Sequence, residues 1–269
     1  MNIYISVVSH GHFELIESLG CLIDINRCKN IRVIVKNNKY DEFLIDYCNE
    51  HGILVIDGEY NKGFGENNNI VFNYYYSNFG VSDDDIFVIL NPDVLISKEV
   101  VLDVSSKMVD DGVMLSTINL FRDVNKLEYD NAVRKFPKFR DFVGSFLGTG
   151  NKTILDKSRI EQSTDVDWAA GSCLFFSAKH YQALKGFDQN YFMYCEDIDI
   201  CYRSNKLLNE RLIYYPYFHA IHLAKHANRK VFSKHFYWHV SSILKFISFK
   251  LLSNNKRKEI VDSCVICNE

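Results

Sequence analysis

The first half of the chain alternates short apolar runs with longer runs whose apolar residues recur at helical spacing. Apolar runs of strand length cover residues 2–8, 31–35, 53–56, 85–90 and 113–118, and helix-period runs cover 13–23, 40–52, 66–79 and 98–110. Strands that alternate with helices predict a parallel sheet with helices on both faces. Such sheets bind ligands in the crevice beyond the carboxyl ends of their strands. We therefore expect functional residues directly after strands.

The second half is less regular. From Asn119 to Val166 charges and glycines are frequent, and we expect a long loop or partly ordered segment over the pocket. Regular patterning returns with WAAGSCLFFS at 168–177, and RLIYY at 211–215 predicts a final strand that ends at Pro216. An aromatic and basic helical tail follows.

Composition limits the protein class. A chain of 269 residues with 47% hydrophobic content can bury the core of one large α/β domain, with or without an appendage. The start of the chain shows no basic region and no cleavage site, so we expect a cytoplasmic protein. No apolar run approaches the roughly 20 residues that a bilayer crossing needs. The excess of basic over acidic residues is concentrated from Arg203 onward, and the chain contains no motif that reads a nucleic acid sequence, so we do not expect nucleic acid binding.

Cysteine usage indicates reduced thiols. The chain has 8 cysteines scattered through apolar segments, which does not suit a disulfide framework. One C-x-x-C pair, Cys264 and Cys267, lies near the end without a second pair of zinc ligands.

Two segments carry candidate ligand-binding residues. Asp93 in LNPDV follows a predicted strand, where a carboxylate can hold a divalent cation against a diphosphate; Asn-Pro-Asp is also an ordinary turn. In NKGFGENNN, at 61–69, Gly63 and Gly65 allow close backbone approach to a ligand, and the following helix N-terminus favours anions. The glycine spacing matches neither a phosphate-binding loop nor a dinucleotide fingerprint.

Adjacent carboxylates, Glu196 and Asp197, follow an aromatic segment at the predicted start of a helix. They suit a helix N-terminus, and they equally suit a general base at the rim of a pocket. Asp199 and Arg203 are spaced for a helical i, i+4 ion pair with a structural role that contributes about 0.3–0.5 kcal/mol.

Three histidines, His219, His222 and His226, follow the last predicted strand. They suit a zinc cluster, or one of them completes an oxygen-rich site with Asp93. Hydrogen-bonded structural roles remain the alternative for each.

Five segments together resemble the family 2 glycosyltransferases of the GT-A fold, and within them the bacterial rhamnosyltransferases of O-antigen synthesis. They are NKGFGENNN, LNPDV, VDWAAGSCLFF, GFDQNYFMYCEDIDICYR and YYPYFHAIH. The resemblance covers about residues 1–226 and implies an α/β GT-A catalytic domain with a mostly parallel central sheet and helices on both faces. Its donor half is about 1–118 and its acceptor half about 165–226, and 227–269 is a helical tail.

The resemblance also implies an activity. It is transfer of rhamnose with inversion, from dTDP-L-rhamnose to an N-acetylglucosaminyl-diphospho-undecaprenol-type lipid-linked acceptor. Asp93 matches the last acid of the family's metal motif, and His222 completes the site for Mg²⁺ or Mn²⁺, with His219 as the fallback. Asp197 matches the general base, with Glu196 beside it.

Further site residues follow from the resemblance. Asn37 stands where the family usually has an aspartate that reads the pyrimidine base, and its carboxamide oxygen can still accept from the ring N–H. The donor-binding residues are Ser9, Asn37, Asn61, Gly63, Phe64, Gly65, Asn68, Asn91 and Asp93. The acceptor-binding residues are Trp168, Gly171 and Ser172.

The tail suits a helix in the headgroup layer of the inner leaflet, where each well-placed Lys or Arg gains about 1 kcal/mol from anionic lipid. It equally suits a helix that packs on the catalytic domain or on a second subunit. For the function, the alternatives are a family 2 enzyme that uses another nucleotide sugar, a zinc hydrolase built on the three histidines, and a non-catalytic nucleotide-binding module.

Overall fold

The computed structural model describes residues 1–138, 141–142, 152–223 and 234–253. Its first four long strands form the parallel half of the sheet, as the sequence predicts. They are β1 (Ile3–Ser9), β2 (Ile31–Asn37), β3 (Leu54–Asp57) and β4 (Ile86–Leu90), in the spatial order β3-β2-β1-β4. Because parallel strands end at the same edge of a sheet, the residues after β1, β2 and β4 meet there.

Beyond β4 the sheet is mixed. β10 (Cys173–Ser177) runs antiparallel between β4 and β6 (Leu115–Phe121), and β11 (Leu212–His222) runs parallel to β6. β5 (Val94–Leu95) and β8 (Thr164–Val166) pair antiparallel with β11. A small second sheet joins β7 (Val133–Arg134) to β9 (Trp168–Ala169).

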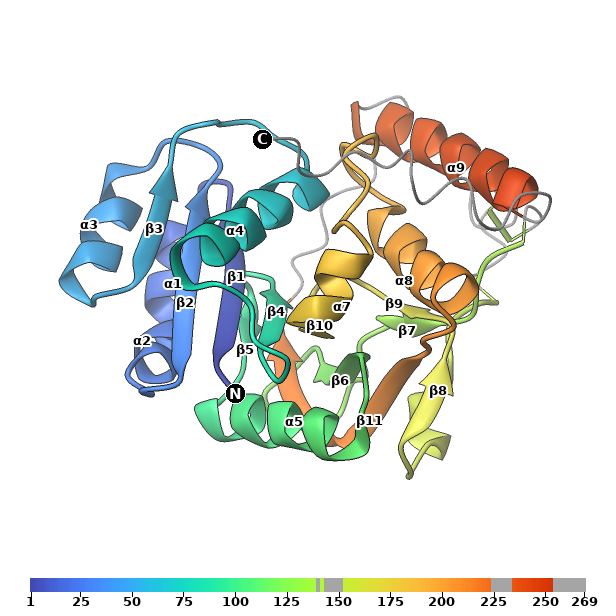
Figure 1. Ribbon diagram of the computed structural model, residues 1–269, viewed down its shortest axis with the longest axis horizontal. Helices are drawn as coiled ribbons and strands as arrows, with labels where there is room; N and C mark the ends of the chain where they lie inside the picture. The colour runs from blue at the N-terminus through green and yellow to red at the C-terminus, as the bar shows by residue number, and fades with distance from the viewer. Residues whose placement is uncertain (139–140, 143–151, 224–233, 254–269) are drawn as a thin grey trace.

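Helices cover both faces of the sheet (Figure 1) and bury two hydrophobic clusters. One cluster takes side chains from α1 (Phe13–Leu19), α2 (Cys21–Asn26), α3 (Glu42–Glu50) and α5 (Lys98–Asp111). The other takes them from α4 (Phe64–Phe79), α7 (Ala178–Ala183), α8 (Glu196–Leu207) and α9 (Lys234–Ser253). The single helix expected at 13–23 is interrupted at Gly20, whose left-handed backbone (φ 61°) separates α1 from α2.

The prediction that the last strand ends at Pro216 is wrong. β11 continues to His222, and its pairing with β6 shifts register between Tyr215 and His219. Proline has no N–H to donate to a neighbouring strand, so an irregularity in the ladder accommodates it. The extension brings His222 opposite Val94 of β5.

Much of the segment expected to be a long loop, Asn119 to Val166, has regular structure within the described residues. Phe121 pairs with Tyr129 and Arg134 with Ile154 in antiparallel bridges, and a short 3-10 helix, η1 (Lys157–Arg159), follows. Residues 139–140 and 143–151 of this segment lie outside the described residues.

The helix α9 packs on the catalytic part of the chain and lies beside α8 (Figure 1). Phe246 is fully buried, with its ring 5.7 Å from that of Tyr202 on α8. Within the described residues, no helix combines the length and apolar character that a membrane crossing requires. The cysteines of the described part are all free thiols; Cys264, Cys267 and His226 lie outside it.

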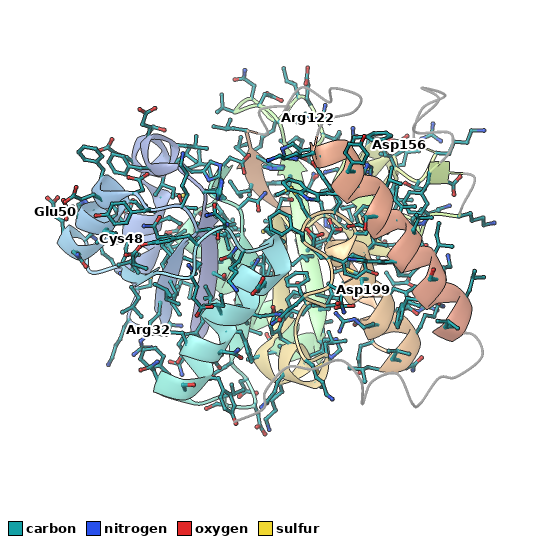
Figure 2. The ribbon with its side chains drawn as sticks, turned by 90° about the horizontal axis from the view of Figure 1, so that it is seen from above. Arg32, Cys48, Glu50, Arg122, Asp156 and Asp199 are labelled. Atoms are coloured by element: carbon teal, nitrogen blue, oxygen red, sulfur yellow. The ribbon has the colours of Figure 1, made fainter. Side chains whose placement is uncertain are left out.

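The predicted ion pair between Asp199 and Arg203 is present, but it is buried, so the small energy expected for it is too low. Its N–O distance is 2.7 Å, and the two side chains are 2% and 4% exposed. Arg203 also donates to the carbonyl oxygens of Leu184 and Gly186. Asp199 lies in the interior of the molecule, among the side chains around α8 (Figure 2).

We predict that Asp199→Ala lowers the free energy of unfolding by about 3–5 kcal/mol, because it leaves the Arg203 guanidinium buried without its counter-charge. Urea denaturation monitored by circular dichroism measures this loss. The control is Asp24→Ala, which removes the helical partner of Arg27 where both side chains are largely exposed and should change stability only slightly. Equal effects of the two substitutions would contradict the prediction.

Candidate active site

Two predicted metal ligands, Asp93 and His222, meet where β5 pairs with the end of β11. The backbone N–H of Leu223 donates to the carbonyl oxygen of Asp93 at 3.0 Å, which holds the two segments together. Asp93 Oδ1 lies 3.4 Å from His222 Nε2 and is buried without a hydrogen-bond partner. A buried carboxylate oxygen without a partner is costly, and a bound cation satisfies it.

The geometry of this pair suits a hard divalent cation. Two neighbouring ligands of an octahedral ion with bonds of about 2.1 Å lie about 3 Å apart. Within the described part of the chain, no group of three or more His, Cys, Asp or Glu side chains is arranged to hold a metal ion. A site with two protein ligands suits Mg²⁺ or Mn²⁺, which keep waters and bind substrate phosphates, better than a closed zinc site.

The other two histidines of the predicted cluster do not join this pair. His219 lies opposite Asn119 in the β11–β6 ladder, and its ring packs 5.5 Å from that of Phe121. His226 lies outside the described residues. The described residues therefore give no support to a zinc hydrolase.

Asp130, which the sequence did not indicate, holds the other side of the His222 ring. His222 Nδ1 and Asp130 Oδ2 are 2.7 Å apart. Burial lowers the pKa of His222, but the hydrogen bond with Asp130 and the negative charges of Asp93 and Asp130 outweigh it and raise this pKa to about 9. Asp130 was missed because it lies in a segment without periodicity and in none of the motifs.

The segment Gly171–Ser172 connects the turn of Asp93, a predicted metal ligand, to Asp197, the predicted base. The backbone N–H of Asn91 donates to the Ser172 carbonyl oxygen at 2.9 Å, and the N–H of Gly171 lies 3.4 Å from Asp197 Oδ2. Residues from three distant parts of the sequence are thus brought together at one edge of the sheet.

The two adjacent carboxylates have different surroundings at the start of α8. Asp197 is partly exposed and accepts a hydrogen bond from the N–H of Ile198 at 2.8 Å. Burial raises the pKa of Asp197, and this N–H, Arg134 and the N–H of Gly171 oppose the rise. Glu196 is buried, and its Oε2 has no hydrogen-bond partner. Burial and the charge of Asp197 raise the pKa of Glu196 well above its usual range. The surroundings of Asp197 therefore favour its ionised form, whereas those of Glu196 favour its protonated form.

The loop expected to approach the donor packs mainly against protein. The N–H of Phe64 donates to the Phe192 carbonyl oxygen at 3.1 Å, and a Cβ on Gly63 would meet that oxygen at 2.4 Å. A Cβ on Gly65 would meet the Cβ of Phe187 at 2.6 Å. These two glycines therefore permit close contact with the segment before α8. The predicted approach of a ligand to this loop stays a prediction.

Two further residues predicted to touch substrates have structural partners. Asn68 is fully buried: its amide oxygen accepts from Ser6 Oγ at 2.7 Å and its amide nitrogen donates to the Phe64 carbonyl at 2.9 Å. The indole N–H of Trp168, a buried residue, donates to the Lys135 carbonyl at 2.9 Å. These polar groups are thus bonded within the protein, and direct contact of Asn68 and Trp168 with substrates stays a prediction.

Phe64, Asn61 and Ser172 keep positions compatible with the site. A Cβ on Gly171 would meet the Phe64 ring at 2.8 Å, so the loop at 61–69 touches the segment before β10. Asn61 is exposed with a left-handed backbone (φ 60°). The hydroxyl of Ser172 is buried without a hydrogen-bond partner.

The ends of β1 and β2 carry the remaining predicted donor residues. Asn37 Nδ2 donates to Asp57 Oδ1 at 2.9 Å, while Asn37 Oδ1 is buried and without a partner. Asp57, at the end of β3, was missed by the sequence analysis. Ser9 is buried, and its Oγ accepts from the N–H of His12 at 3.1 Å. Burial lowers the pKa of His12 and the charge of Asp93 raises it, which places this unpredicted histidine near the metal-site acid.

Comparison with known proteins identifies the protein family to which the chain belongs. No protein-family model matches the chain. The chain is 39% identical over 264 residues to the rhamnosyltransferase WbbL of Escherichia coli K12, covering 97% of this chain and 98% of that protein. The chain belongs to the WbbL rhamnosyltransferase family. This confirms the family predicted from the sequence and makes the protein a glycosyltransferase.

One further relative and one solved structure are similar to this glycosyltransferase. One is the N-acetylglucosaminyl-diphospho-decaprenol L-rhamnosyltransferase of Mycobacterium tuberculosis, 28% identical over 174 residues, or 61% of this chain and 55% of that protein. The other is a crystal structure of GalNAc-T7 with UDP, GalNAc and Mn²⁺, which superimposes with a TM-score of 0.64 at 12% identity over 92% of this chain and 48% of that chain. The structural likeness confirms the predicted GT-A fold.

We predict that Gly63→Ala lowers the free energy of unfolding by about 1–3 kcal/mol, because the added methyl group overlaps backbone atoms of Phe192. Thermal unfolding measures the change. The adjacent substitution Lys62→Ala is the control, since it removes only contacts of the Lys62 ammonium with Glu59 and Glu66. Wild-type stability of Gly63→Ala would show that the loop and the segment before α8 are not in close contact.

Proposed function

We propose that this glycosyltransferase transfers rhamnose, with inversion, from dTDP-L-rhamnose to an N-acetylglucosaminyl-diphospho-undecaprenol-type lipid-linked acceptor in O-antigen synthesis. The observation that carries the proposal is the connection through Gly171 and Ser172 between the turn of Asp93 and the carboxylate of Asp197. The names of the relatives in Escherichia coli and Mycobacterium tuberculosis support the sugar, and the second of them supports the class of acceptor.

Asp93 and His222 would hold a divalent cation, Mg²⁺ or Mn²⁺. Their proximity and the unpartnered oxygen of Asp93 support this assignment. When bound, such a cation neutralises the charge that develops on the departing nucleoside diphosphate. Asn91, at the start of the same turn, is fixed by its backbone hydrogen bond to Ser172.

Asp197 would act as the general base. Its carboxylate takes the proton from the acceptor hydroxyl while that oxygen attacks the anomeric carbon, and the bond from this carbon to the diphosphate oxygen breaks on the opposite face. One displacement of this kind inverts the configuration. The raised pKa of Asp197 favours proton acceptance, and the N–H groups around it keep the group ionised for the reaction.

Asn37 and Asp57 support a pyrimidine nucleotide as the donor. Asp57 accepts from the amide nitrogen of Asn37 and thereby leaves the amide oxygen as the unpartnered acceptor. An acceptor of this kind suits the ring N–H of thymine or uracil. A family member that uses another nucleotide sugar is the alternative, and binding of a panel of nucleotide sugars separates the two.

The outer face of α9 would associate with the inner face of the cell membrane. Four of its apolar side chains are 57–65% exposed, and the helix contains lysines but no acidic residue. They are Tyr237, Leu244, Leu251 and Leu252. A helix with this composition lies in the headgroup layer of an anionic bilayer, where a lipid-linked acceptor is found.

We predict that Asp197→Asn lowers kcat by about 10²–10⁴-fold, because the amide cannot accept the proton. The dissociation constant of dTDP-L-rhamnose should stay within about threefold of the wild-type value, since Asp197 acts on the acceptor. Steady-state kinetics with a short-chain lipid-diphosphate acceptor and calorimetric donor titration provide the two measurements.

The adjacent substitution Glu196→Gln is the matched comparison. Glutamine has the shape of a protonated glutamic acid, so this variant should keep much more of the wild-type kcat than Asp197→Asn does. Full turnover by Asp197→Asn would remove Asp197 from the role of base. A larger loss in Glu196→Gln would assign that role to Glu196.

For the membrane contact, we predict that Leu244→Glu combined with Leu251→Glu weakens binding to vesicles rich in phosphatidylglycerol at least about tenfold. The change removes apolar burial and adds repulsion from the anionic lipid. Co-sedimentation with vesicles measures binding. The control is Val124→Glu with Leu127→Glu, two exposed apolar residues outside α9. Unchanged binding by the α9 variant would place the membrane contact elsewhere.

A further inference from the structure

Asp130 is a buried carboxylate that the proposed reaction does not use. It is 7% exposed, and its backbone N–H donates to the Leu120 carbonyl oxygen at 2.9 Å, next to the bridge between Phe121 and Tyr129. Its side chain reaches His222 Nδ1 at 2.7 Å. The backbone of Asp130 is thus tied to β6, the strand that pairs with β11, which carries His222.

We infer that Asp130 is a positioning residue for the cation site and that it acts through His222. The inference rests on the proposed assignment of Asp93 and His222 as the cation ligands. Asp130 lies on the far side of the imidazole from Asp93, so its role is to fix the ring and not to bind the cation.

The physical argument starts from the two ring nitrogens. An ionised carboxylate only accepts hydrogen bonds, so Nδ1 of His222 carries the proton and donates it to Asp130. A cation that binds displaces the second ring proton, and the lone pair of the resulting neutral imidazole lies on Nε2, the nitrogen 3.4 Å from Asp93 Oδ1. A hydrogen bond of this kind fixes both the tautomer and the orientation of a metal-binding histidine.

A purely structural role as the counter-charge of a buried lysine is the competing explanation. Lys157 is 4% exposed and interacts electrostatically with Asp130. Its ammonium group, however, donates to the Leu120 carbonyl oxygen at 2.9 Å and lies 5.6 Å from the centre of the Tyr129 ring. Asp130 Oδ2 is directed to His222, which favours the positioning role.

The test measures binding of Mn²⁺ alone to the full-length protein, through the electron paramagnetic resonance signal of the free aqua ion. We expect Asp130→Ala to weaken Mn²⁺ binding about 10–100-fold. Asp130→Asn should show a smaller loss, because its carboxamide oxygen still accepts from Nδ1. The control is Glu128→Ala, an exposed acid in the same segment, which should keep wild-type affinity. Thermal unfolding of each variant verifies that it is folded.

A double-mutant cycle distinguishes positioning from general structural support. If Asp130 acts through His222, then Asp130→Ala changes Mn²⁺ affinity little in a protein that already carries His222→Ala. An equal loss in both backgrounds overturns the inference, as does wild-type Mn²⁺ affinity of Asp130→Ala when His222→Ala binds weakly. If Asp93→Ala and His222→Ala both keep wild-type affinity, the proposed cation site fails together with the role of Asp130. The role of Asp197 is tested separately, by the kcat of Asp197→Asn. A failure of the proposed cation site is therefore distinguishable from a failure of the proposed base.

Discussion

The direction of one strand determines how the site is assembled. β10 runs antiparallel to β4, so the beginning of β10 lies at the edge of the sheet where β4 ends. The two residues before β10, Gly171 and Ser172, therefore meet the turn that follows β4. From there the N–H of Gly171 reaches Asp197 at the start of α8. A parallel strand in this position would have placed Gly171 and Ser172 at the opposite edge of the sheet, far from Asp93.

The segment before α8 connects this site to the outer helix. Residues 190–194 contact the donor loop through the Phe192 carbonyl, and on their other side they contact α9. Ser242 donates to the Met193 carbonyl at 2.9 Å, and the Trp238 ring packs 4.7 Å from that of Phe192. The packing of α9 on the catalytic part is therefore compatible with an exposed face that contacts lipid, since opposite sides of the helix make the two contacts.

The sequence predicted helices, strands and turns well where contacts between residues close together in the chain determine them. The βαβ alternation, the turn at Asn91 and the helix that begins at Glu196 depend on hydrophobic periodicity and on residues a few positions apart. The predictions failed where distant contacts decided the outcome. Pro216 lies inside a strand because β6 holds β11 on both sides of the irregularity. The pairing of Asp199 with Arg203 was predicted from their spacing, but its burial was not, because carbonyl groups of residues 184 and 186 surround Arg203 in the interior.

The sequence by itself determined the family, the α/β class and the identity of the candidate acids Asp93 and Asp197, because motif spacing and hydrophobic pattern are properties of the chain. Tertiary structure alone decided which polar groups remain without partners. Asn68 and Trp168 use their polar groups within the protein, whereas Asn37 and Asp93 each keep a buried oxygen without a hydrogen bond. It also brought Asp130 to His222 across 92 positions of the chain. A hydrogen bond depends on where two atoms lie in space, and that placement follows only from the packed sheet.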